Sequence, residues 1–300
     1  MNLDQLLNLA SEQPNKTVAL ASAADKEVIE AVQTAVDKKL ASFILYGEQK
    51  EIVKLLDEHG LSHSESIRIV QASSDREASK AAVTAVRNGE ADVLMKGMVS
   101  TSVILKEVLN KEYGLRQGKV LSHVAAFDVP GYDRLIFVTD SGMNIEPDLT
   151  QKVEIVKNAV SIARRSGLSM PKVVPLAAVE VVNPAMQATL DAAALAQMNR
   201  RGQINDCIID GPLALDNAIS VEAAAHKGIE SEVAGKADIL LVPTIEVGNA
   251  LYKSLVYFAN AKVGGVIAGA KAPIVLTSRA DSAQSKVYSI ALAVSSAKLY

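Results

Sequence analysis

Short runs of apolar and β-branched residues alternate with amphipathic stretches along almost the whole chain, and this alternation constrains the fold more than any other feature. The runs predict buried strands, and the stretches between them predict helices. Strands joined by helices favour right-handed crossovers and an α/β fold with mostly parallel sheets. The predicted strands are residues 17–22, 42–47, 66–72, 91–97, 122–129, 134–141, 172–180, 205–210, 237–243, 265–269 and 273–277.

Amphipathic stretches predict the helices that connect these strands. In the stretch 148–167, Val153, Val156 and Val160 recur at helical spacing and form one apolar stripe. Asp148 and Gln151 stand at its start with the spacing of a capping box. The predicted helices are residues 24–40, 48–59, 75–90, 103–110, 148–167 and 282–298.

The number of predicted strands bears on the domain organisation. They are too many for one comfortable sheet, which favours two α/β domains. The glycine-containing loops at 129–133 and 262–265 are the places where we expect the chain to cross between domains. The prediction is a discontinuous first domain, residues 1–133 plus 265–300, and a second domain, residues 134–264.

Composition excludes several classes of protein. Among the 300 residues 49% are hydrophobic, 4% are aromatic and none is Trp, so Ala, Val, Leu and Ile must build most of the core. The net charge of −3, without a basic tract, lacks the signature of a nucleic-acid binder. No apolar run approaches the ~20 residues of a membrane helix, and the first ten residues resemble no signal peptide. We therefore expect a soluble, cytoplasmic protein with neither nucleic-acid nor membrane partners.

The single cysteine, Cys207, excludes an internal disulfide framework and any multi-cysteine metal site. It lies in an apolar run, where a small buried side chain is favoured over a nucleophile.

Ligands in such folds bind at the carboxyl ends of strands, where helix N-termini present N–H groups. The segment 96–102 offers Lys96, a glycine and the hydroxyls of Ser100 and Thr101 near a helix start, which suits a phosphate. The alternative is a solvated turn in which Ser100 or Thr101 caps the helix. A second segment, 140–144, ends in Asn144 and is either a substrate contact or a turn built by its Gly and Asn.

Two further strands end abruptly in turn residues, at 210–216 and 243–249. Asp210 and Asp216 could suggest a metal, but their spacing matches no calcium loop and they lack neighbouring histidines. We therefore expect no metal site. His226 is predicted at a polar helix end, and His123 within a strand.

The segment Ser278-Arg279-Ala280-Asp281 directly follows the last predicted strand. An arginine there can clamp a phosphate with its planar fork of donors. Ser278 can donate to a developing negative charge, and Asp281 can accept a proton. As an alternative, Asp281 with Gln284 can cap the helix that follows.

Five strings resemble, in order, the phosphate acetyltransferase and phosphate butyryltransferase family, and most closely its butyryltransferases. They span about residues 91–281 and read KGMVSTS, TDSGMNIEPD, DGPLALDNA, VAGKADILLVPTIEVGNALYK and IVLTSRADS. The resemblance implies a two-domain, isocitrate dehydrogenase-like fold with the active site in the cleft between the domains. It also implies reversible transfer of an acyl group between coenzyme A and inorganic phosphate, with no cofactor and with coenzyme A as a substrate. Family members act as dimers or larger homo-oligomers.

The same resemblance implies roles for individual residues. Arg279 would hold the phosphoryl group, and Ser278 would stabilise the thiolate or the carbonyl oxyanion. The acetyltransferases place a base aspartate where this chain has Ser285, so Asp281 is the nearest candidate base. Ala214 replaces the glutamine of the acetyltransferases and favours a butyryl-type enzyme. Tyr252 falls within the matched Gly-Asn-x-x-Tyr-Lys element, and the predicted phosphate- or coenzyme A-binding residues are Lys96, Ser100, Thr101, Asn144, Gly211, Pro212, Asp216, Gly248, Asn249 and Lys253.

Three alternatives stay open at this point. One is a phosphate acetyltransferase, and another is an NAD-dependent hydroxy-acid dehydrogenase of the same fold. The third is a module that binds coenzyme A or phosphate without catalysis, which the absence of an aspartate at Ser285 would favour.

Overall fold

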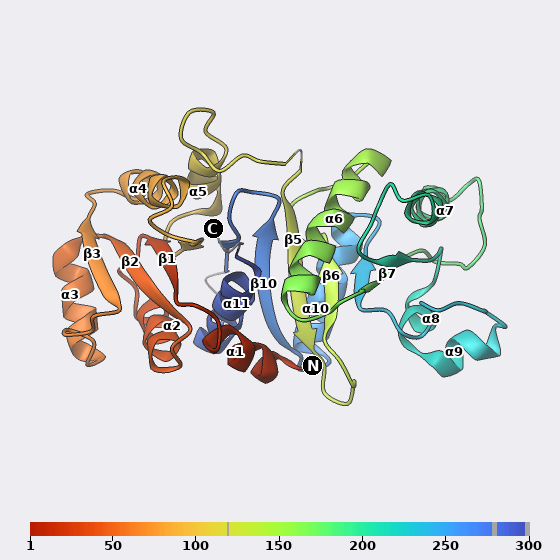
Figure 1. Cartoon of the computed structure of the whole chain (residues 1–300), viewed down its shortest axis with the longest axis horizontal. Coiled ribbons are helices and arrows are strands. Elements are labelled where there is room, and N and C mark those ends of the chain that lie inside the picture. Colours follow the sequence, from red (N-terminus) through yellow and green to blue (C-terminus); the bar gives the residue numbers. More distant parts are fainter. Residues whose placement is uncertain (119, 278–280, 298–300) are drawn as a thin grey trace. The chain divides into compact units, whose positions relative to one another are not determined.

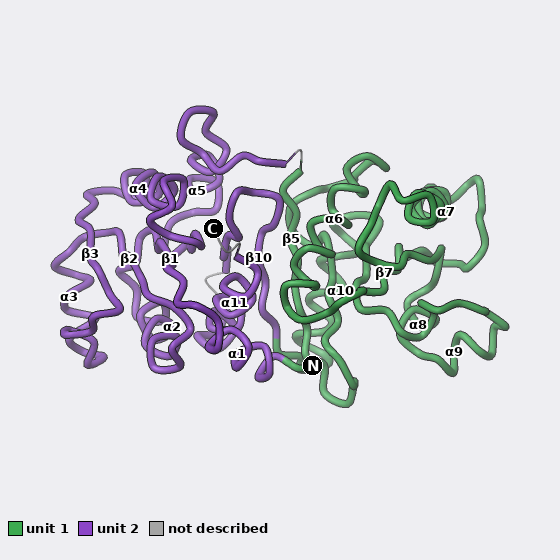
Figure 2. Tube along the Cα trace, in the orientation of Figure 1, with its two compact units in different colours: residues 1–2, 119–262 green, residues 3–118, 263–300 purple. Residues whose placement is uncertain are grey.

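The computed structural model describes residues 1–118, 120–277 and 281–297 of the chain. The chain divides into two compact units (Figure 2). Unit 1 comprises Met1–Asn2 and Lys119–Lys262, and unit 2 comprises Leu3–Gly118 and Val263–Tyr300. Both are α/β units with mostly parallel strands (Figure 1). Among the described helices, none has both the length and the apolar character needed to cross a membrane.

Unit 2 contains strands in the order β3-β2-β1-β4-β11-β10, of which only β10 runs antiparallel to its neighbour β11. Leu20, Leu94 and Met95 in β1 and β4 are fully buried, as expected for parallel strands that are covered on both faces. The strands are β1 (Lys16–Ala21), β2 (Ala41–Gly47), β3 (Ile67–Gln71), β4 (Val93–Lys96), β10 (Lys262–Ala268) and β11 (Ile274–Val275).

Helices cover the sheet of unit 2 in two groups. The first group packs together and consists of the helices that follow β1, β2 and β11, together with the first helix of the chain. The second group consists of α4 and α5, which pack against each other. The helices are α1 (Leu3–Ser11), α2 (Lys26–Asp37), α3 (Gln49–Glu58), α4 (Asp75–Arg87), α5 (Thr101–Val108) and α11 (Ala283–Ser296).

Unit 1 contains strands in the order β5-β6-β9-β7-β8, with β5 antiparallel to β6 and the others parallel. Phe127 and Phe137 are fully buried in its core. Helices α6 and α7 pack together, and α10 contacts β6. The elements are β5 (Ser122–Asp128), β6 (Ile136–Thr139), β7 (Lys172–Pro175), β8 (Ile208–Ile209), β9 (Ile239–Leu241), α6 (Leu149–Arg165), α7 (Gln187–Arg200), α8 (Leu215–Ile219), α9 (Val221–His226) and α10 (Ile245–Tyr257).

Each predicted strand overlaps an observed strand, and the α/β class with mostly parallel strands is confirmed. The capping box of α6 is also confirmed, because the backbone N–H of Gln151 donates to Asp148 Oδ1 at 2.8 Å and that of Asp148 donates to Gln151 Oε1 at 2.9 Å. His226 ends α9 and His123 lies in β5, as predicted.

The loop predicted at 262–265 is wrong, because these residues form the first half of β10. The glycines that suggested a loop have another cause. A Cβ atom on Gly264 would lie 2.7 Å from the backbone carbon of Tyr288, so the close approach of α11 requires a glycine in this strand.

Candidate functional site

The strand order of unit 2 creates a switch point between β1 and β4, which are parallel neighbours. The helix that follows β1 belongs to one packing group, and the helix that follows β4 belongs to the other. The chain therefore leaves the two strands toward opposite faces of the sheet. In parallel α/β sheets ligands bind outside the carboxyl ends of the strands at such a switch point.

Lys96 ends β4 at this switch point and is only 5% exposed. Its ammonium donates to the carbonyl oxygens of Gly97 and Val99, at 3.1 and 3.3 Å. Gly97 lies directly against the end of β1, where a Cβ atom would come within 2.1 Å of the Ser22 carbonyl oxygen. A buried cation is thus held beside a backbone segment that only glycine can form, an arrangement that suits an anionic group.

Ser100 caps α5, because its hydroxyl accepts from the backbone N–H of Val103 at 3.4 Å. The capping alternative is therefore confirmed for Ser100, whose hydroxyl also lies 3.1 Å from that of Ser102. Thr101 is the first residue of α5 and is exposed. The structure places both residues a few positions after Lys96, at the same end of the sheet.

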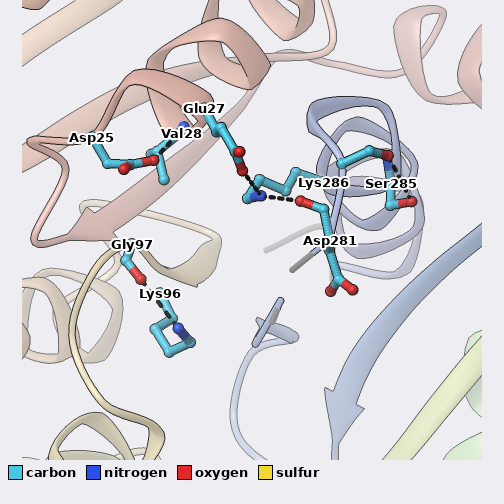
Figure 3. A network of polar contacts seen from close by, with 9 residues as sticks. Asp25, Glu27, Val28, Lys96, Gly97, Asp281, Ser285 and Lys286 are labelled. Carbon is cyan, nitrogen blue, oxygen red and sulfur yellow. Dashed lines mark hydrogen bonds and ion pairs between the residues drawn. The ribbon is translucent and has the colours of Figure 1, made fainter. Parts of the chain in front are cut away.

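The segment that follows β11 contains the candidate catalytic residues. Ser278 and Arg279 lie outside the described residues. Asp281 is half-buried, and its backbone carbonyl accepts a hydrogen bond from the ammonium of Lys286. The carboxylate of Asp281 points away from that ammonium (Figure 3).

The predicted Asp281–Gln284 cap is wrong, because Ser282 is the N-cap of α11. The hydroxyl of Ser282 accepts from the backbone N–H of Ser285 at 3.2 Å. The carbonyl of Asp281 is turned toward Lys286, and the helix begins one residue later than the predicted cap requires. The capping function is therefore carried by Ser282, not by the Asp281 carboxylate.

Lys286 links two loops of unit 2 across the end of β4. Its side chain is 4% exposed, and its ammonium lies 3.2 Å from Oε2 of Glu27 in the first turn of α2. Helix α2 follows β1, Asp281 follows β11, and β4 lies between those two strands. The link therefore spans the strand that ends in Lys96, and both lysines appear in the same close-up (Figure 3). We found no sequence signal for this ion pair, because its partners are far apart in the chain.

In unit 1, Asp140 follows β6 and is 2% exposed. Its carboxylate accepts from the backbone N–H groups of Gly142, Met143 and Asn144 at 2.9, 2.9 and 3.2 Å. The Asn144 side chain donates to the same carboxylate at 2.6 Å and to the Leu121 carbonyl at 2.8 Å. The structure thus gives Asn144 a turn-forming role, which was one of its two predicted interpretations.

A histidine that the sequence did not single out as functional lies beside this turn. Nδ1 of His123 is 2.8 Å from the Ser141 hydroxyl, and the rings of His123 and Tyr252 are 6.0 Å apart. Tyr252 also packs edge-on against Phe127, with ring centroids 5.1 Å apart. Only the period-two pattern of β5 could have placed His123 and Phe127 on one face of the strand.

The Gly-Asn-x-x-Tyr-Lys element lies on α10 and divides between two sides of the helix. A Cβ atom on Gly248 would lie 2.7 Å from the Asp140 carbonyl oxygen, so this glycine allows the helix to pack against the turn after β6. Asn249 and Lys253 are exposed instead. The Lys253 ammonium lies 5.8 Å from the ring centroid of Tyr257 and 5.9 Å from that of Tyr252.

The remaining predicted residues lie after β8, which is separated from β6 by β9 and β7. Three strand spacings are roughly 14 Å, so these residues are not brought to the Asp140 turn. Gly211 and Pro212 are joined by a cis peptide bond, and Pro212 is buried. Asp216 is exposed, with its carboxylate 3.8 Å from the Lys227 ammonium. Within residues 1–118, 120–277 and 281–297, no group of three or more His, Cys, Asp or Glu side chains could hold a metal ion.

Comparison with known proteins shows which family this chain resembles. The profile of the phosphate acetyl/butaryl transferase family matches residues 1–82 and 66–294. The chain is 57% identical over 300 residues to a probable phosphate butyryltransferase of Bacillus subtilis (strain 168), covering 100% of this chain and 99% of that protein. It is 50% identical over 292 residues to a phosphate butyryltransferase of Clostridium beijerinckii, covering 97% of this chain and 96% of that protein.

A solved structure supports the same grouping. The crystal structure of a branched-chain phosphotransacylase from Enterococcus faecalis V583 is similar to this chain with a TM-score of 0.83 at 37% identity. The match covers 94% of this chain and 98% of that chain.

Proposed function

Because the chain belongs to the phosphate acetyl/butaryl transferase family, we infer that it is an acyltransferase that moves a short-chain acyl group reversibly between coenzyme A and inorganic phosphate. The observation that carries this inference is the 57% identity to a probable phosphate butyryltransferase along the full length of both chains. Butyryl is the favoured acyl group, since relatives of that name are the most similar of those described above.

The proposed reaction takes place in a ternary complex, without a covalent acyl-enzyme. The sulfur of coenzyme A gives up its proton and attacks the carbonyl carbon of the acyl phosphate. The carbon–oxygen bond to phosphate then breaks, so that a thioester forms and phosphate leaves. A thiol with an ordinary pKa of about 8.5 is deprotonated readily when a base accepts its proton or a nearby cation lowers its pKa. Most of the acceleration would come from orientation and from stabilising the oxyanion.

In this proposal Arg279 holds the phosphoryl group, and Ser278 donates to the thiolate or the oxyanion. Asp281 is the candidate base, and the finding that Ser282 caps α11 supports it, since the cap was the competing role. Lys96 supports phosphate binding, because its buried ammonium lies at the switch point of unit 2.

The other predicted substrate contacts are supported either by their position in the structure or by the family motif alone. Ser100 and Thr101 are supported by their position near Lys96. Gly248, Asn249 and Lys253 rest on the family motif, as do Asn144, Gly211, Pro212 and Asp216. Coenzyme A as a substrate with no separate cofactor, a homo-oligomeric assembly, a cytoplasmic location and a two-domain, isocitrate dehydrogenase-like arrangement belong to the same proposal.

One assay tests the proposed function against its alternatives. Butyryl-, propionyl- or acetyl-CoA is mixed with the protein and phosphate, and released coenzyme A is read with a thiol reagent. Phosphate-dependent release, fastest with butyryl-CoA, is the expected result, and fastest release with acetyl-CoA would make the chain an acetyltransferase. No release from any of the three would overturn the proposal, and an absorbance change with NAD and hydroxy acids would point to a dehydrogenase.

A further inference from the structure

A cavity of about 760 Å³ lies within unit 1, between helix α6 and the turn that precedes β8, and is called the α6 cavity below. Its lining comes from two segments, residues 157–169 and residues 203–206. The first segment leads into β7 and the second into β8, so the cavity lies at the amino ends of these parallel strands. The described residues that line it include none of the substrate-binding residues predicted in unit 1, which follow the carboxyl ends of strands.

The charged residues that line the α6 cavity are three cations and one acid. Lys157, Arg164 and Arg165 come from α6, and Asp206 comes from the turn before β8. The lining therefore has a formal charge of +2, in a chain whose net charge is −3. The two arginines lie about two turns beyond Lys157, so all three cations face the same side of the helix. A concave surface lined mostly by one sign of charge attracts ligands of the opposite sign.

Basic residues in the last turn of a helix have a common structural role, which is to complement the partial negative charge of the terminal carbonyls. That role does not account for this cluster. The backbone N–H groups of Ser166, Gly167 and Leu168 already donate to three carbonyls at the end of α6, at 3.0, 3.0 and 3.1 Å. Lys157 lies two turns before the helix end, and the effect of a helix terminus falls off within its last turn.

The contacts that these cations make within the chain are exposed and can be exchanged. Nη1 of Arg164 lies 2.8 Å from Oδ1 of Asp206, and the two side chains are 43% and 60% exposed. Nε of Arg164 also donates to the Ser169 carbonyl at 3.2 Å. The Lys157 ammonium lies 3.1 Å from Oε1 of Glu154 on the same helix. Exposed ion pairs of this kind contribute little to stability, so an anionic ligand can replace the carboxylates at a small cost.

We propose that the α6 cavity binds a small organic diphosphate, of which a nucleoside diphosphate is an example. The planar forks of Arg164 and Arg165 suit two adjacent phosphoryl groups, and Lys157 adds a third positive charge. Three cations exceed what one phosphate ester, with a charge of about −2, requires.

The rest of the lining suits the organic part of such a ligand. Val160 and Leu168 are apolar, whereas Ser161, Gln203 and Asn205 can donate or accept hydrogen bonds. The cavity volume also falls within the range of about 300–1,000 Å³ that is typical of small-molecule sites, and a phosphate ion alone would leave most of it empty. Coenzyme A contains a diphosphate as well, so the ligand has two possible sources, a free nucleotide or coenzyme A itself.

The first test titrates the purified full-length chain with ADP by isothermal calorimetry, at one fixed low salt concentration. We expect ADP to bind, and AMP, which has one phosphoryl group fewer, to bind about 10-fold more weakly. Arg164→Gln should weaken ADP binding at least about 10-fold. Arg68→Gln is the matched control, because Arg68 is 59% exposed and pairs with Glu90 in unit 2, and it should leave the Kd unchanged. No binding of ADP, AMP binding as tight as ADP, or an unchanged Kd in Arg164→Gln would overturn the proposal.

A variant with the opposite expected effect tests the site even if Arg164→Gln folds poorly. Asp206→Asn removes the carboxylate that competes for Arg164, so ADP should bind about 3-fold more tightly. The backbone of Asp206 has a φ of 65°, which asparagine also tolerates, so this change keeps the turn. Unchanged or weaker ADP binding in Asp206→Asn would contradict the proposed site.

A second titration, with coenzyme A at saturation, separates the two sources of the diphosphate. ADP binding that persists assigns the α6 cavity to a free nucleotide. ADP binding that disappears, together with weaker coenzyme A binding in Arg164→Gln, assigns the cavity to coenzyme A. If ADP binding disappears but Arg164→Gln binds coenzyme A normally, ADP occupies the coenzyme A site and the proposal is wrong. Because binding is measured without turnover, the result stands apart from the acyl-transfer assay.

Discussion

Asp140 in unit 1 and Asp281 in unit 2 each lie in a loop after a buried strand, but the two loops use them differently. The carboxylate of Asp140 is 2% exposed and accepts three backbone N–H groups and one amide from its own loop. At Asp281, a half-buried residue, Lys286 donates to the backbone carbonyl, and the carboxylate points away from that ammonium (Figure 3). The Asp140 carboxylate therefore builds its own turn, whereas at Asp281 it is the backbone carbonyl that Lys286 holds.

Two buried lysines, Lys152 in unit 1 and Lys96 in unit 2, also differ in what they contact. Lys152 in unit 1 pairs with Asp191 at 2.6 Å, and both side chains are less than 9% exposed. Lys96 in unit 2 is equally buried, but it donates to two carbonyls of its own loop at the switch point. Removing Asp140 should therefore lower the stability of unit 1, whereas changes to the candidate catalytic segment of unit 2 should lower the activity.

Asp140→Ala should have the largest effect. It leaves three partly buried N–H donors without their acceptor, and each such donor costs toward the lower end of about 1–3 kcal/mol. We expect a loss of about 4 kcal/mol in the free energy of unfolding, measured by urea titration. Asp133→Ala is the matched control in the same unit, because Asp133 is exposed, and it should change stability by less than about 0.5 kcal/mol. An Asp140→Ala protein of normal stability but without activity would reverse the comparison.

Arg279→Lys should have the converse effect. A point ammonium keeps the charge but cannot reproduce the bidentate fork of a guanidinium on phosphate. We expect turnover to fall about 100-fold, with the urea midpoint unchanged. Steady-state coenzyme A release, measured at saturating and at limiting phosphate, checks this. Near-normal turnover would mean that the phosphate is held by another group.

Lys286→Met should have a smaller effect on activity and little on stability. Methionine fills the same buried space, and Glu27, 57% exposed, can be solvated once its partner is lost. The Asp281 carbonyl loses its donor, and we expect kcat to fall about 10-fold with the KM for coenzyme A unchanged. Lys286→Arg should recover part of that loss, because it restores a cation that can donate to both partners. A fall in stability that fully accounts for the lost activity would show that Lys286 only supports the fold.

Local patterns predicted the elements of the fold because strands and helices follow from the spacing of apolar residues. The capping box at Asp148 and the cap at Ser100 are local hydrogen bonds, and sequence spacing alone reveals them. The position of Lys96 near the end of a predicted strand was equally visible. That β1 lies beside β4, and therefore that Ser22 meets Gly97, depends on long-range strand pairing that no local pattern encodes.

Two differences between the predicted and the observed elements occur where tertiary packing, and not an amphipathic pattern, determines the local structure. Helix α10 was not predicted because its apolar residues surround it and leave no single stripe to detect. The strand residue Gly264 suggested a loop, although its cause is the approach of Tyr288. The link from Lys286 to Glu27 joins residues 259 positions apart, so only the folded chain reveals it.

The smallest expected effect on activity concerns Cys207, the single cysteine of the chain, which lies buried in unit 1. Burial, with a smaller contribution from the charge of Asp206, raises the pKa of this thiol from 9.0 to about 11. At pH 8 its thiolate is then about 100-fold scarcer than that of an ordinary thiol, and alkylation by iodoacetamide, followed by mass spectrometry, should be slower by at least that factor.

The pH dependence of stability follows from the same shift. The unfolded chain releases this proton near pH 9, whereas the folded chain keeps it until about pH 11. The thiol therefore contributes stability below pH 9 that is lost as the pH rises toward 11. Cys207→Ala, the matched control, should remove that part of the pH dependence and leave coenzyme A release unchanged. Rapid alkylation at pH 8 with loss of activity would contradict the raised pKa of Cys207 and would place a functional thiol in unit 1.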